Sequence, residues 1–132
     1  MKFFHPLVLF LDDDLQQSAK SFNNEFLELN IKHTIQVLFC GLFYFIGIRN
    51  KKFHKYYFDK DRKDESMHKW FPGYPYKKVP SFVYYNSPES RWVRKCADHF
   101  MYLTEYLGYM LDEFEIRQGK SHPSWEIYDF FI

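Results

Sequence analysis

Residues 12–48 carry a continuous pattern of helical hydrophobic spacing, which restricts the fold of this chain more than any other feature. Three aspartates open the stretch and suit the positive N-terminal end of a helix. The apolar residues form two stripes, one made of Leu15, Ala19, Phe22, Phe26 and Leu29 and one of Leu27, Ile31, Ile35, Leu38, Leu42 and Phe45. At about 100° per residue, the stripes lie on opposite sides of a straight helix. The sequence therefore predicts either a helix enclosed on both sides or a break near Asn23, Asn24 and Asn30.

Glu28 is the acidic residue of interest in this stretch. It precedes Ile31 by three residues and Ile35 by seven, so it shares a helical face with apolar side chains. One interpretation is a solvent-facing acid on a helix that turns differently from this projection, and periodicity alone favours it. The other is a buried carboxylate available for acid–base chemistry.

A second helical signal begins at Ser87-Pro88-Glu89, where an N-cap, a first-turn proline and a first-turn acid follow in the favoured order. Gly119 follows Arg117 at a position suited to a left-handed C-cap. Between these ends, apolar side chains recur at spacings of three and four: Trp92, Cys96, Phe100, Leu103, Leu107, Met110 and Phe114. The pattern predicts one helix of about eight turns over residues 88–117, with Glu105, Asp112, Glu113 and Glu115 on a solvated face.

The remaining segments complete an all-α prediction. Residues 6–11 are interpreted as an extended arm or a short strand, and residues 121–132 as an aromatic tail without helical period. A chain of 132 residues is long enough for one hydrophobic core and too short for two. We predict a single domain over residues 1–132, with two long helices, shorter helices, an irregular connection and a docked aromatic tail.

The connection, residues 49–79, contains ten basic and four acidic residues interleaved with aromatic ones. Basic side chains neutralise phosphates, and aromatic faces stack on exposed bases. The alternative is a solvated loop whose aromatic side chains fold back onto the core, and the sequence leaves both open here and in the tail. The candidate nucleic-acid-binding residues are Lys51, Lys52, Lys55, Lys60, Arg62, Lys63, Tyr74, Tyr76, Lys77, Lys78, Trp125 and Tyr128.

Several classes of site find no support in the sequence. The six histidines never occur at the i, i+4 spacing of a helical zinc pair, and Cys-x-x-Cys, a Gly-rich phosphate loop and a nucleophile elbow are absent. We therefore expect no metal and no cofactor. Cys40 and Cys96 both fall within helical patterns and are interpreted as small buried residues in a reducing compartment. The apolar run from Val37 to Ile48 is too short to cross a membrane, so we expect a cytoplasmic protein without a membrane partner.

Three blocks of the chain together resemble the pyrimidine-dimer DNA glycosylases, the small all-α endonuclease V type found in phages and some viruses. The blocks are residues 24–29 (NEFLEL), Pro80-Ser81-Phe82 with the helix that follows, and residues 122–128 (HPSWEIY). Asn86-Ser87-Pro88 with Trp92 is also similar to an Asn-His-Pro…Trp pattern of phage and bacterial relatives. The resemblance implies an all-α fold, Glu28 at the position of the catalytic carboxylate, and a tail that touches DNA.

The chain departs from this family at the catalytic positions. The family's nucleophile is the α-amine of an N-terminal threonine, whereas here the bulky Lys2 follows Met1. Leu27 and Ile31 stand where the family has arginines beside its glutamate. We therefore expect a non-catalytic phage or viral member that binds nucleic acid or a host protein. The alternatives are an active DNA glycosylase/AP lyase using Glu28 with the Met1 amine or a nearby lysine, and a purely structural helical domain.

Overall fold

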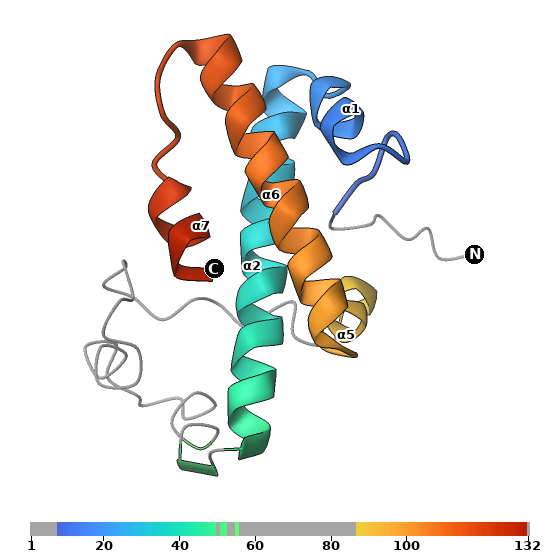
Figure 1. The fold of residues 1–132 in the computed structure, drawn as a ribbon, viewed down its shortest axis with the longest axis vertical. Helices are drawn as coiled ribbons and strands as arrows, with labels where there is room; N and C mark the ends of the chain where they lie inside the picture. The colour runs from blue at the N-terminus through green and yellow to red at the C-terminus, as the bar shows by residue number, and fades with distance from the viewer. Residues whose placement is uncertain (1–7, 50, 53–54, 56–86, 132) are drawn as a thin grey trace.

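A computed structural model describes residues 8–49, 51–52, 55 and 87–131 of the chain (Figure 1). These residues form helices and no strand, as the all-α prediction requires. Two long helices cross one another, with α1 and α5 on one side of α6 and α7 on the other. The elements are α1 (Leu15–Lys20), α2 (Asn24–Arg49), α5 (Pro88–Val93), α6 (Ala97–Gln118) and α7 (Trp125–Phe131).

The predicted helix over residues 12–48 breaks at the first asparagine pair. Asp14 caps α1, since its side chain accepts a hydrogen bond from the Gln17 backbone N–H. Asn23 then caps α2, accepting from the Phe26 N–H at 2.8 Å through its side chain. Short polar side chains of this kind satisfy backbone donors that a new helix leaves unpaired. The break lets α1 and α2 aim their apolar faces independently at one core.

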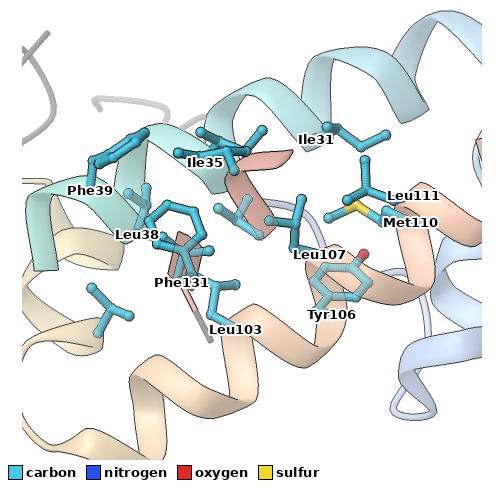
Figure 2. Close-up of a cluster of buried hydrophobic side chains, with 14 of the residues drawn as sticks. Ile31, Ile35, Leu38, Phe39, Leu103, Tyr106, Leu107, Met110, Leu111 and Phe131 are labelled. Carbon is cyan, nitrogen blue, oxygen red and sulfur yellow. The ribbon is translucent and has the colours of Figure 1, made fainter. Parts of the chain in front are cut away.

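The core lies where α2 crosses α6. The second apolar stripe faces inward, and Leu27, Ile31 and Leu38 are each at most 1% exposed. Figure 2 shows side chains of α2 pointing towards side chains of α6, among them Leu103, Leu107, Met110 and Leu111. Burying each such side chain stabilises the fold by about 1.5–3 kcal/mol before entropy is subtracted. The α2–α6 crossing is therefore the principal source of hydrophobic stabilisation.

The prediction of one helix over residues 88–117 is wrong, because the chain turns at residues 94–96. Both ends are as predicted: Ser87 caps α5 and accepts from the Ser90 N–H, and Gly119 adopts the left-handed conformation with φ 69°. In between, Cys96 is extended and begins α6, so it is exposed and not inside a helix as expected, whereas Cys40 is buried.

Packing against α2 explains this turn. A Cβ atom at Gly41 would lie 2.8 Å from Cγ1 of Val93, so α5 approaches α2 at a point where only glycine fits. The turn is stabilised from the other side by His99, whose Nδ1 lies 2.6 Å from the Trp92 carbonyl oxygen and whose ring stacks on Trp92 at 4.1 Å. Such a bond satisfies a carbonyl group at the end of α5.

The C-terminal tail is a helix, contrary to the expectation of an aromatic segment without helical period. The buried residues of α7 are Ile127 and Phe131, one helical turn apart. The Tyr128 ring covers Gly108 of α6, where a Cβ atom would meet it at 3.1 Å. Two buried positions in seven residues are too few for periodicity to indicate a helix, and contact with α6 supplies the missing stabilisation. The expected docking of the tail is confirmed.

Partly buried hydrogen bonds to side chains of α1 and α2 hold residues 8–11 as an arm. Asn30 of α2 accepts from the Leu9 N–H at 2.8 Å and donates to the Leu9 carbonyl oxygen at 3.2 Å. Ser18 of α1 accepts from the Leu11 N–H at 2.9 Å. The arm therefore satisfies its backbone groups with side chains, and the predicted strand alternative is not seen in these residues.

Arg117, near the end of α6, joins this helix to α1 and α2. Its guanidinium pairs with Glu113 at 2.8 Å and donates to the Asn24 side chain at 3.1 Å and the Lys20 carbonyl oxygen at 2.9 Å. Glu113 is thus engaged in an ion pair and not simply part of a solvated face.

Among the described residues, no helix is both long and apolar enough to cross a membrane.

Candidate functional site

Glu28 lies on the surface of α2, as the solvent-facing interpretation predicts. Its side chain is 52% exposed, whereas Leu27 and Ile31 are 1% exposed and belong to the core. Ile35, seven residues along the same face, is also buried. The face is apolar where α6 packs against α2, whereas Glu28 meets His122 of the chain that follows α6.

His122 forms a defined hydrogen-bonded pair with Glu28. Its Nε2 lies 3.1 Å from Oε1 of Glu28, and its Nδ1 accepts from the Ser124 backbone N–H at 2.9 Å. An acceptor at Nδ1 requires a lone pair, so the hydrogen is on Nε2 and is donated to the carboxylate. The edge-on ring of Phe114, with centroids 4.6 Å apart, holds the imidazole in place.

A hollow of about 510 Å³ opens beside this pair. Lys120, Ser121 and His122 reach it from the chain that reverses after Gly119, and Glu28 reaches it from α2. Phe114, Gln118 and Pro123 complete the lining. The hollow therefore combines a carboxylate, an imidazole, an amine and a hydroxyl group, a set capable of binding a polar ligand or moving a proton.

Sequence reasoning assigned no function to Lys120, and it placed His122 only in the tail block that the resemblance implies touches DNA. Both lie within five residues of the helix-ending Gly119, which was recognised. Their approach to Glu28 depends on the direction in which the chain leaves α6, and no local pattern encodes that direction.

Trp125 and Tyr128 lie on α7 and pack against the hydrophobic core. Both are partly buried, and their rings meet edge to face with centroids 5.1 Å apart. Tyr128 also contacts Gly108, as described above. The two rings therefore stabilise the docking of α7.

Lys51, Lys52 and Lys55 are exposed and helical just beyond the end of α2. They are separated from Glu28 by nearly the whole of α2, which extends about 30 Å from Glu28 to Arg49. The structure therefore does not bring Glu28 together with these lysines. Met1 and the other proposed nucleic-acid-binding residues lie outside the described residues: Lys60, Arg62, Lys63, Tyr74, Tyr76, Lys77 and Lys78.

Within the described ranges, no group of three or more His, Cys, Asp or Glu side chains is arranged to hold a metal ion. The resemblance to the pyrimidine-dimer glycosylases stays a prediction from the blocks quoted above. Comparisons of the chain with protein-family models, with curated proteins and with solved structures found no match.

Proposed function

We propose that this protein binds nucleic acid without catalysis, as an altered relative of the pyrimidine-dimer glycosylases. The observation that carries the proposal is the exposed group of Lys51, Lys52 and Lys55 at the far end of α2. Lys51, Lys52 and Lys55 lie within five residues of sequence and are all exposed, so together they offer three cations to a phosphate backbone. The lysines begin the basic aromatic segment, whose composition supports the same function.

The surroundings of Glu28 support binding over catalysis. Leu27 and Ile31 are buried in the core, so the two positions where the family has arginines supply no cation to DNA. An enzyme that flips a nucleotide out of the duplex needs such cations to offset the cost of unstacking. Glu28 is also hydrogen-bonded to His122 and largely solvated.

Salt-dependent binding of a labelled DNA duplex and a labelled single strand, followed by fluorescence anisotropy, tests the proposal. The triple variant Lys51→Gln, Lys52→Gln, Lys55→Gln should bind about tenfold more weakly at low salt. Its slope of log affinity against log salt should be shallower by roughly 2 to 3. The matched control replaces the exposed Lys20, Lys32 and Lys95 with glutamine and removes the same charge. Equal loss in both variants, or no binding by the unaltered protein, contradicts the proposal.

The second candidate function is an AP lyase, favoured by Lys120 lining the same hollow as Glu28 and His122. An unprotonated Lys120 amine would attack the C1′ aldehyde of an abasic deoxyribose and, after loss of water, form an imine. A base in the hollow would then remove a C2′ proton, and the 3′-phosphate would leave. This reaction needs neither an oxidant nor a metal ion.

Borohydride trapping on abasic DNA separates the two functions. The non-catalytic proposal predicts no covalent adduct, with DNA binding retained. An adduct that disappears in Lys120→Gln, and is reduced in Glu28→Gln, would establish the lyase instead. An adduct that persists in Lys120→Gln and disappears when the N-terminal amine is blocked would assign the nucleophile to Met1.

A further inference from the structure

A groove lined by aromatic rings and carboxylates lies between the N-terminal arm, α5 and α6. It has a volume of about 680 Å³, within the range of ligand-binding clefts. Its apolar wall is formed by Phe10, Pro88, Trp92 and Tyr102, and its polar wall by Asp12, Asp13 and Glu89. The groove is distinct from the hollow at Glu28 and shares no lining residue with it.

The aromatic wall is held in position from behind. Phe10 stacks on the buried Tyr106 with ring centroids 4.6 Å apart, and the ring of Tyr102, one helical turn earlier on α6, has its centroid 6.3 Å from that of Phe10. Trp92 meets Tyr102 edge to face at 6.1 Å. Phe10 and Tyr102 nevertheless remain 45% and 41% exposed. These rings are therefore held in place by their neighbours and still open to a ligand. Binding a ligand against them costs little side-chain conformational entropy.

Three carboxylates lie among the lining residues of the groove: Asp12, Asp13 and Glu89. Asp12 and Asp13 are exposed at its rim, and none of its lining residues is Lys or Arg. The acidic region continues along α6, since the carboxylates of Glu105, then Asp14 and Asp112, raise the pKa of Tyr109. A phosphate backbone would be repelled here, whereas a cation would be attracted both to the carboxylates and to the ring faces.

We propose that this groove binds an arginine- or lysine-rich segment of a partner protein. A guanidinium or ammonium group lies against the open faces of Tyr102 and Phe10, with its charge next to Asp12, Asp13 and Glu89. The carboxylates come from both the arm and α5, so a segment with more than one basic residue can pair with both elements. The inference goes beyond nucleic-acid binding, because it uses another surface of opposite charge.

The test uses a fluorescein-labelled peptide of alternating arginine and glycine, with a citrulline peptide as its uncharged isostere. Fluorescence anisotropy on the full chain should detect binding of the arginine peptide only, with weaker binding at higher salt. The variant Asp12→Asn, Asp13→Asn, Glu89→Gln should lose about tenfold or more in affinity. Tyr102→Leu, which keeps an apolar side chain at a partly exposed position, should lose about threefold.

A matched charge control replaces Glu25, Glu126 and Asp129, all exposed and outside the groove, by their amides. This control should bind the arginine peptide with at most a small loss. Equal affinity for the citrulline peptide, equal weakening in the control, or no binding of the arginine peptide overturns the proposal. The lysine variant that tests DNA binding should keep full peptide affinity, so failure of either proposal is recognised separately.

Discussion

The phenolic oxygen of Tyr106 lies 2.6 Å from the carbonyl oxygen of Leu9, a residue 97 positions earlier in the chain. The tyrosine donates this hydrogen bond, and its oxygen lies 2.8 Å from the hydroxyl of Ser18, which therefore donates to it. One buried side chain on α6 thus connects the arm, α1 and the core. Asn30, also buried, adds two bonds to Leu9, and the Ser18 hydroxyl accepts from the Leu11 N–H.

Tyr106→Phe should lower the free energy of unfolding by about 1–2 kcal/mol, because Ser18 loses its acceptor and Leu9 keeps only its longer bond from Asn30. Urea unfolding followed by circular dichroism measures the change. Tyr109→Phe is the control, since its hydroxyl lies 3.4 Å from Glu105 at the surface. Its effect should stay within about 0.5 kcal/mol. An equal loss in both variants would contradict a role of the buried network.

Gly41→Ala should destabilise the protein by about 1–3 kcal/mol, although alanine is the better helix former, because the new Cβ meets Val93. In a Val93→Ala background the same change should become neutral or stabilising by up to about 1 kcal/mol. A double-mutant cycle from urea unfolding gives the coupling between the positions. Additive effects would show that α5 moves away from α2 without cost.

The two cysteines should differ in reactivity. Burial raises the pKa of the Cys40 thiol to about 11, whereas Cys96 is exposed at the start of α6. Iodoacetamide at neutral pH should modify Cys96 in the folded protein and Cys40 only on unfolding, as read by mass spectrometry of peptides. Rapid modification of both cysteines under native conditions would contradict the buried position of Cys40.

The same shift predicts a loss of stability in base. The unfolded thiol ionises near its ordinary pKa of 9.0, but the folded thiol stays protonated until about pH 11. The free energy of unfolding is therefore fully maintained below pH 9 and falls by up to roughly 1.4 kcal/mol per pH unit between these values. Burial also raises the pKa of Tyr106, which acts in the same direction. In Cys40→Ala, urea unfolding across this range should show a shallower decline.

The neutral His122 ring should be found as the Nε2–H tautomer. Long-range ¹H–¹⁵N correlation spectra distinguish this tautomer by the shift of the unprotonated Nδ1. Ser124→Pro removes the backbone N–H that fixes the tautomer, and should allow the other form to appear. A dominant Nδ1–H form in the unaltered protein would contradict the pairing with Glu28.

The amino-acid sequence determined the ends of helices and the identity of the core face of α2. Ser87 and Gly119 act through bonds and dihedral angles within a few residues, and such local chemistry is readable from the sequence. The apolar stripe that includes Ile31 and Leu38 likewise predicts which side of α2 is buried. The all-α class follows from these local signals.

Only the tertiary structure decided where helices break and which side chains meet. The turn at residues 94–96 depends on the approach of Val93 to Gly41, and α7 depends on contact with Gly108. Glu28 meets His122 only because the chain reverses after α6, across 94 residues of sequence. Long-range contacts of this kind produce no periodic pattern in the sequence, because each is made by a few residues whose neighbours in space are distant in the chain.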